Sequence, residues 1–177
     1  DLKSIRKTKS KIIRSSGTST NLKSKIVIDT STSVNQRRSL SKILAYIIGK
    51  HRKTFYVLDA KPSYDSRSYE VNARIAGMQG YMIAAKSIKY LLVKKRDKLI
   101  LDKSVLLNLK KNSDAVLIGY TYMLWKHIVK NDSFQLKKTE SLNNLNLIHF
   151  GGWKKLSDHR IGKKEFTKTD RRYFIFP

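Results

Sequence analysis

The 177-residue sequence predicts an α/β fold, in which a small parallel sheet with flanking helices begins as a Rossmann-like βαβ unit. Short β-branched runs alternate with helix-like patterns, and 40% of the residues are hydrophobic, which is enough to build a buried core. The chain carries 38 Lys plus Arg against 13 Asp plus Glu, a formal charge of +25. This excess predicts a basic extended arm before the core and a basic, aromatic tail after it.

Residues 1–24 form the predicted arm. No acidic residue lies between Asp1 and Asp29, and the segment is rich in Ser and Thr without a sustained hydrophobic period. An arm that lies on nucleic-acid phosphates and a transit peptide share this composition. We favour the arm of a processed protein.

A strand, a helix and a second strand are expected next. Lys25–Asp29 is a short β-branched run, and residues 54–58 form another that ends at Asp59. Between them, apolar residues recur at the spacing of one helical face: Leu40, Ile43, Leu44, Ile47 and Ile48. Gly49 ends that helix. A strand–helix–strand unit of this kind predicts parallel pairing of its two strands.

Shorter elements are predicted for the remainder of the core. The patterns indicate a helix over 71–92, a strand over 99–101, a helix over 105–109, a strand over 114–119 and a helix through 122–129. The expected organisation is an α/β domain over 25–130, a polar loop or insertion over 131–146, and a tail over 147–177 that completes or leaves the domain.

The sequence lacks the residues that several common kinds of functional site require. There is no Cys, which excludes disulfides, thiolate zinc sites and cysteine nucleophiles within this sequence. The turn after the first predicted strand, residues 29–33, contains no Gly and no Lys of a phosphate-binding loop. The four histidines, at positions 51, 127, 149 and 159, lack the spacing of a helical zinc site. We therefore expect no cofactor, no metal, no catalytic residue and no membrane partner.

The charge predicts a polyanionic partner, and nucleic acid is favoured because the cations are spread along the whole chain. Cations bind phosphates, while aromatic rings stack on unpaired bases. The residues predicted to bind RNA are Lys3, Arg6, Lys7, Lys9, Lys11, Arg14, Arg37, Arg38, Trp153, Lys154, Lys155, Arg160, Lys163, Lys164, Arg171 and Arg172.

Two segments of the sequence resemble parts of one known family. Lys25-Ile26-Val27-Ile28-Asp29-Thr30, followed by the helix and by Phe55-Tyr56-Val57-Leu58, resembles an opening of the type I-I-D-L-x-K-T, helix, I-L-F-V. Phe150-Gly151-Gly152-Trp153-Lys154-Lys155-Leu156 resembles a stretch of the type W-x-G-G-x-L-T-N-W-K. Both belong to the second small-subunit ribosomal protein family, and the divergent organellar members are the most similar.

This resemblance implies a structural constituent of the mitochondrial small ribosomal subunit that acts in translation and has no enzymatic activity. Its partners would be ribosomal RNA and other ribosomal proteins in the mitochondrial matrix. The apolar end of the sequence, residues 173–177, adds the hypothesis that a second polypeptide completes the fold.

Two alternatives stay open from the residues alone. Asp29 and Asp59 would lie at the carboxyl ends of adjacent strands, which is compatible with a metal-dependent nuclease. A viral or nucleoid packaging protein would carry the same charge and bind DNA or genomic RNA instead.

Overall fold

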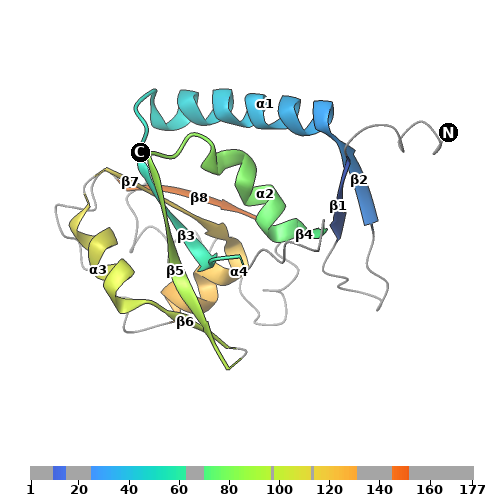
Figure 1. Ribbon diagram of the computed structural model, residues 1–177. Helices are drawn as coiled ribbons and strands as arrows, with labels where there is room; N and C mark the ends of the chain where they lie inside the picture. Colours follow the sequence, from blue (N-terminus) through green and yellow to red (C-terminus); the bar gives the residue numbers. More distant parts are fainter. Residues whose placement is uncertain are drawn as a thin grey trace. The chain divides into compact units, whose positions relative to one another are not determined.

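The structure is a computed structural model that describes residues 10–14, 25–62, 70–96, 98–112, 114–130 and 145–151 (Figure 1). The chain divides into two compact units. Unit 1 comprises residues 1–51 and 62–84, and unit 2 comprises residues 52–61 and 85–177. The boundaries predicted from composition, after residues 24, 130 and 146, stay a prediction.

Unit 1 contains a three-stranded sheet in the order β2-β1-β4. Strand β1 (Ser10–Arg14) pairs antiparallel with β2 (Lys25–Asp29) and parallel with β4 (Glu70–Asn72). Two helices complete the unit, α1 (Thr30–Ile48) and α2 (Ala73–Met82). The predicted arm therefore includes a strand, because Ser10–Arg14 forms the centre of this sheet.

Helix α1 begins at a side-chain cap. The Asp29 carboxylate accepts hydrogen bonds from the Thr32 backbone N–H at 2.6 Å and from the Ser31 hydroxyl at 2.8 Å. These bonds, the Thr32 backbone bond foremost, hold the pKa of Asp29 below its ordinary value. A Cβ at Gly80 of α2 would overlap the Leu40 side chain, so Gly80 permits a close approach of the two helices.

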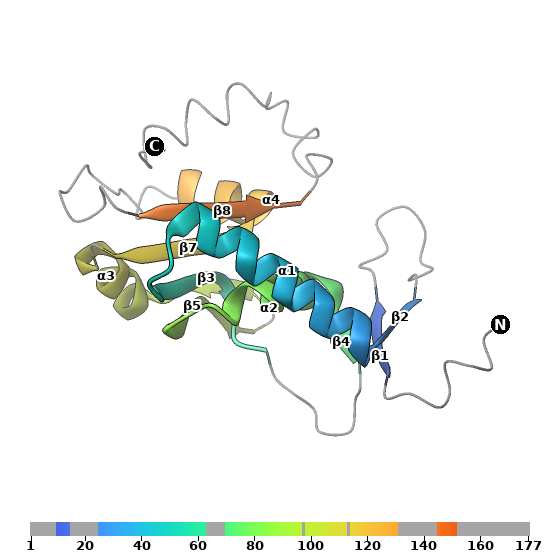
Figure 2. The same cartoon turned by 90° about the horizontal axis from the view of Figure 1, so that it is seen from above.

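Unit 2 contains a five-stranded sheet in the order β6-β5-β3-β7-β8. Its strands are β3 (Thr54–Ala60), β5 (Ser87–Lys95), β6 (Lys98–Leu101), β7 (Ala115–Tyr120) and β8 (Asn146–Phe150). Strands β5, β3, β7 and β8 pair in parallel, whereas β6 pairs antiparallel with β5. Figure 2 shows β8, β7, β3 and β5 in this order.

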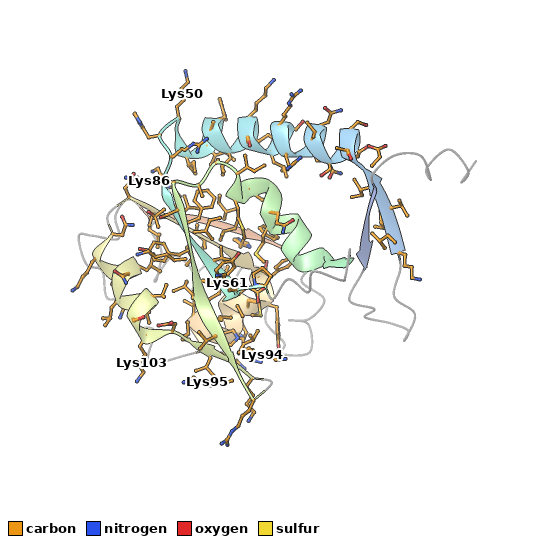
Figure 3. All side chains as sticks on the ribbon, viewed as in Figure 1. Lys50, Lys61, Lys86, Lys94, Lys95 and Lys103 are labelled. Carbon is orange, nitrogen blue, oxygen red and sulfur yellow. The ribbon has the colours of Figure 1, made fainter. Side chains whose placement is uncertain are left out.

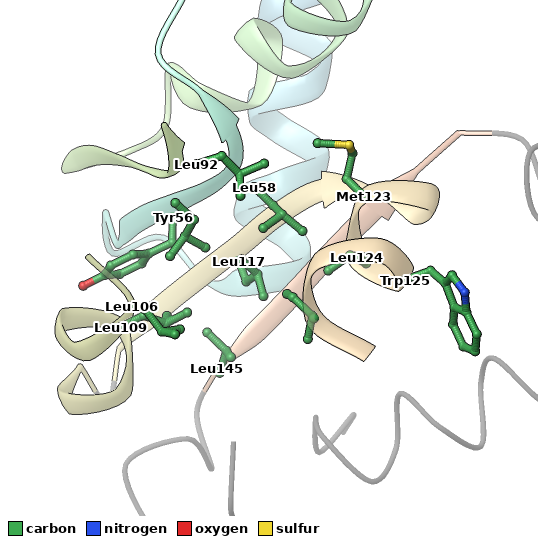
Figure 4. Packing of buried hydrophobic residues seen from close by; sticks show 13 residues of the cluster. Tyr56, Leu58, Leu92, Leu106, Leu109, Leu117, Met123, Leu124, Trp125 and Leu145 are labelled. Carbon is green, nitrogen blue, oxygen red and sulfur yellow. The ribbon is translucent and has the colours of Figure 1, made fainter. Parts of the chain in front are cut away.

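One apolar cluster of unit 2 is built from this sheet and its helices (Figure 4). Helix α3 (Lys103–Lys111) contributes Leu106 and Leu109, which lie beside Tyr56 of β3. Helix α4 (Thr121–Leu124) continues directly into the π-helix η2 (Trp125–Val129), which adds Trp125 and Ile128. The central strands β3 and β7 are buried along most of their length, as expected for parallel strands.

The predicted α/β class is confirmed, with a mostly parallel five-stranded sheet and flanking helices. The predicted βαβ start is wrong, because β2 lies in the three-stranded sheet and β3 lies in the five-stranded sheet. The predicted helix over 71–92 is also wrong in its second half, where Ser87–Lys95 forms β5. The strands and helices predicted within 98–130 are confirmed.

Candidate active site

The four parallel strands of unit 2 end at one edge of the sheet. From β3, which lies in the middle, the chain continues to β5 on one side and later to β7 on the other side. The strand order therefore reverses between β3 and β7. In open α/β sheets, ligands bind at the carboxyl edge beside such a reversal. The candidate site is built from the ends of β3, β7 and β8.

A threonine and a histidine meet at this edge. Gly119 of β7 is in register with His149 of β8, which brings the ends of the two strands together. The Thr121 Oγ1 lies 3.0 Å from His149 Nδ1, and it lies 3.4 Å from the backbone carbonyl oxygen of Phe150. Thr121 is buried, whereas His149 is at the surface. The buried hydroxyl thus fixes the orientation of an accessible imidazole.

The His149 ring is tuned by its surroundings. Desolvation lowers the pKa of His149 below its ordinary value, because the charged imidazolium loses contacts with water. The neutral ring is then favoured at neutral pH. A neutral imidazole whose Nδ1 is engaged by Thr121 presents its Nε2 to a ligand as a donor or an acceptor, according to the tautomer.

An aromatic pair borders the same edge. The rings of Tyr120 and Phe150 stack edge to face, with centroids 4.7 Å apart and planes at 74°. Gly151 follows with φ at +107°, and a Cβ there would lie 2.7 Å from Cδ1 of Tyr120. Only glycine satisfies both the backbone conformation and the close contact.

Asp59 supplies a carboxylate near the end of β3, on one side of the strand-order reversal. The residue is 2% exposed, and its Oδ1 accepts a hydrogen bond from the Ala60 backbone N–H at 2.8 Å. On the adjacent strand, a Cβ at Gly119 would lie 2.9 Å from Cβ of Leu58, so β3 and β7 pack closely here. β3 therefore carries a buried carboxylate near its carboxyl end, on the strand next to β7.

The β1–β2 hairpin of unit 1 contributes a second sequence feature. Arg14 and Lys25 are in register, and residues 15–24, outside the described residues, join them. This connection contains Gly17, Lys23 and six Ser or Thr residues. Such a composition is typical of phosphate-binding segments, since hydroxyl groups and Lys bind phosphate oxygens. This segment precedes the strand at 25–29, so it lies outside the turn after that strand, where a phosphate-binding loop would be expected.

The structure places few of the predicted RNA-binding residues. Arg37 and Arg38 are exposed on α1, where the Arg37 Nε donates to the Ser33 backbone carbonyl at 3.3 Å. Lys11 and Arg14 belong to β1. The following residues lie outside the described part of the chain: Lys3, Arg6, Lys7, Lys9, Trp153, Lys154, Lys155, Arg160, Lys163, Lys164, Arg171 and Arg172. Their assignment to a binding surface stays a prediction.

The predicted nuclease pair does not form as expected. Asp29 ends β2 and caps α1, whereas Asp59 belongs to a strand of the other sheet. Among the described residues, no group of three or more His, Cys, Asp and Glu could hold a metal ion. No helix in the described part of the chain has the length and apolarity to cross a membrane.

A parallel sheet with a buried carboxylate, an oriented histidine and an aromatic pair at its carboxyl edge is typical of an α/β protein that binds a small ligand. The family model described as "Acyl-protein synthetase, LuxE" matches residues 2–173, so the chain belongs to this family. No curated protein and no solved structure matches the chain.

Family membership corrects the functional predictions. The resemblance to the second small-subunit ribosomal protein family is wrong, and so is the structural role in the small ribosomal subunit and in translation. The partners predicted with it, ribosomal RNA and other ribosomal proteins, are also wrong. A synthetase is an enzyme, which overturns the expectation of no enzymatic activity. The nuclease and packaging alternatives fall with it, while the mitochondrial matrix stays a prediction.

The physical reason for the error is that a positive charge reports an anionic partner but not its kind. Nucleoside triphosphates, acidic proteins and nucleic acids all satisfy the same excess of Lys and Arg. The short apolar motifs used for the resemblance describe a strand–helix–strand order, which many unrelated α/β proteins share.

Proposed function

We propose that this chain provides part of the catalytic unit of an acyl-protein synthetase, an enzyme that joins the acyl group of a carboxylic acid to a protein. The observation that carries the proposal is the family match over residues 2–173. The carboxyl edge of the unit 2 sheet supports it, because an accessible histidine held by Thr121 and an aromatic pair lie there, and β3 carries a buried carboxylate near its end.

The chemistry requires activation of the acid. A carboxylate is a poor electrophile, and a synthetase activates it at the expense of a nucleoside triphosphate. A carboxylate oxygen attacks a phosphorus atom, which forms a mixed acyl–phosphate anhydride and releases pyrophosphate or a nucleoside diphosphate. The nucleophile of the acceptor protein then attacks the acyl carbon, and the phosphate group leaves with the bonding electrons.

Two parts of the chain are suited to these steps. The segment over residues 15–24 contains six Ser or Thr residues, Gly17 and Lys23, a composition typical of phosphate-binding segments. In the tautomer in which Thr121 donates to Nδ1 and Nε2 carries the hydrogen, His149 would donate a hydrogen bond to the carboxylate or phosphate oxygen on which charge develops. Because this sequence contains no Cys, a thioester intermediate would have to form on a residue outside these 177.

The test is acid-dependent cleavage of ATP by the purified full-length protein. Carboxylic acids of increasing chain length are added one at a time, and pyrophosphate, ADP and hydroxamate formation with hydroxylamine are measured. We expect at least one acid to stimulate both phosphate release and hydroxamate formation. Absence of stimulation by every acid would overturn the proposal.

Variants at the sheet edge connect the activity to the candidate site. His149→Ala should lower kcat for acid-dependent cleavage by about 10²-fold, the usual loss when one donor to a developing charge is removed. Thr121→Val should cause a smaller loss and shift the pH profile, since the imidazole loses its fixed partner. His51→Ala, at an exposed position outside both strand ends, is the matched control and should retain activity.

A further inference from the structure

The outer side of α1 carries a small apolar surface in its last two turns. Ile43 is 53% exposed, Tyr46 is 92% exposed and Ile47 is 64% exposed, and we call these three residues the α1 face. Leu44 and Ile48 of the same turns are buried. The apolar part of α1 therefore extends beyond its buried side, and more than half of each α1-face side chain is exposed.

The spacing of the α1 face matches a helical recognition pattern. Positions i, i+3 and i+4 lie together on one side of a helix. Apolar anchors with this spacing dock in hydrophobic grooves of partner proteins. Tyr adds a ring that contributes a large contact area and a hydroxyl for the rim, and it is among the residues that contribute most to interface energies.

Cations surround the α1 face. Lys42 is exposed on α1 just before the α1 face, and Lys50 is exposed just beyond the end of the helix, as Figure 3 shows. Arg38 is exposed one turn before Lys42. The sequence contains no acidic residue between Asp29 and Asp59. Electrostatic complementarity therefore favours a partner with acidic groups around an apolar groove.

We propose that the α1 face docks an acidic protein, and that this protein is the acyl acceptor. The identity of the partner rests on the proposed function, since an acyl-protein synthetase must engage a protein. The partner would insert Ile43, Tyr46 and Ile47 into an apolar groove and place carboxylates beside Lys42 and Lys50.

A protein fits this surface better than an anionic membrane does. A helix that lies in a membrane interface is apolar along its whole buried side. On α1 the same side continues toward the N-terminus with Asn35, Gln36 and Ser39, which are exposed and uncharged. The apolar patch covers only about one and a half helical turns. This length is similar to that of the apolar residues by which a helix docks in the groove of a partner protein.

The experiment first identifies the acceptor by its product. A radiolabelled acid that the enzyme activates is added with ATP and the full-length enzyme to an extract of the source organism, and the labelled protein is purified and sequenced. That protein is then used as the substrate at known concentrations. Its theoretical charge provides an immediate check, because the proposal requires an acidic protein.

The decisive variant is Ile43→Ser/Tyr46→Ser/Ile47→Ser. We expect the KM for the purified acceptor to rise about tenfold or more, as for the loss of interface anchors, with acid-dependent ATP cleavage unchanged. Asn35→Ser/Gln36→Ser on the same side of the helix is the matched control and should leave both values unchanged. Lys42→Glu/Lys50→Glu should raise the KM for the acceptor and weaken its dependence on salt.

The outcomes separate this proposal from the proposed function. An unchanged KM in the triple variant or a basic acceptor would overturn the docking proposal alone. Activation of the acid without any labelled protein would overturn both the acyl transfer to a protein and the docking proposal. Loss of binding to vesicles of phosphatidylglycerol and phosphatidylcholine, with an unchanged KM for the acceptor, would assign the α1 face to a membrane and overturn it too. Absence of acid-dependent ATP cleavage would overturn the proposed function and this proposal with it.

Discussion

Two features require glycine at position 151: its positive φ angle and its close contact with the Tyr120 ring. Gly151→Ala would place an Ala at a φ of +107° and bring its Cβ to 2.7 Å from the Tyr120 ring. Gly49 has a φ of +88° but nothing within 4 Å of a Cβ, so Gly49→Ala reports the backbone cost alone. We expect Gly49→Ala to cost about 1–3 kcal/mol and Gly151→Ala to cost more, measured by urea unfolding.

The contact with Tyr120 can be isolated by a double-mutant cycle. In the Tyr120→Ala background the overlap is absent, so Gly151→Ala should cost less than it does in the wild type. A coupling of about 0.5–3 kcal/mol is expected for side chains in direct contact. Equal costs in the two backgrounds would contradict the packing of Gly151 against that ring.

His127 predicts a pH dependence of stability. It lies buried in η2, and its Nε2 has no hydrogen-bond partner in the described part of the chain. Burial, and secondarily the neighbouring Lys126, lowers the pKa of His127 from the ordinary 6.5. Below that pH the unfolded chain binds a proton more readily than the folded chain does, so the free energy of unfolding should fall as the pH drops.

A substitution that cannot titrate tests this expectation. His127→Gln should show a smaller decrease of Tm between pH 7 and pH 5 than the wild type does. His51→Gln, at an exposed position, serves as the control and should retain the wild-type decrease. The same decrease in the wild type and in His127→Gln would show that other groups cause it. His149 is the natural second candidate, since desolvation lowers its pKa as well.

The buried side of α1 is narrower than the sequence predicted. Substitutions at the adjacent residues Ile43 and Leu44 test this difference. The sequence placed Ile43 and Leu44 on one apolar face, whereas Ile43 is 53% exposed and Leu44 is 1% exposed. Leu44→Ala should lower the free energy of unfolding by about 2–5 kcal/mol, because it removes buried methyl groups and leaves a cavity. Ile43→Ala should change it by less than about 0.5 kcal/mol, as usual for a surface position. Thermal and urea unfolding of both variants provide the measurement, and similar losses would contradict the observed burial.

In the segment over residues 71–92, the spacing of hydrophobic residues does not distinguish a helix from a buried strand. Apolar residues at steps of three and four predicted one long helix, but α2 ends at Met82 and β5 begins at Ser87. Leu91 and Leu92 are both buried, as happens in a parallel strand that is covered on two faces. A strand of this kind lacks alternation, so its sequence can equally satisfy a helical period.

The charge of the whole chain predicts a response to salt. With a formal charge of +25, repulsion between cations opposes the compact state. Raising the NaCl concentration from about 20 mM to about 300 mM shortens the screening length from roughly 20 Å to below 8 Å and should raise Tm. Sucrose in place of NaCl is a control for solvent exclusion without screening. A Tm that is independent of salt would show that the cations are already compensated in the folded chain.

The same charge misled the functional interpretation. An excess of positive charge predicts an anionic partner, but a nucleotide, an acidic protein and RNA all satisfy that prediction equally well. The α/β class could be predicted, because strand and helix patterns are local. The site could be predicted only in part. Asp59 was predicted to lie at the end of a strand, but the contact between Thr121 and His149 was not predicted. They lie 28 residues apart in sequence, and only the register of β7 and β8 brings them to 3.0 Å.

The amino-acid sequence was enough to predict the α/β class, the strand at 54–58 and the absence of cysteine chemistry within these residues. These properties depend on neighbouring residues or on composition, so they need no knowledge of the fold. The assignment of β2 and β3 to different sheets and the exposure of Ile43, Tyr46 and Ile47 became known from the three-dimensional structure. Strand pairing and burial depend on residues that are distant in sequence. The local hydrophobic period shows which side of an element is apolar, but it does not specify which other element will pack against that side.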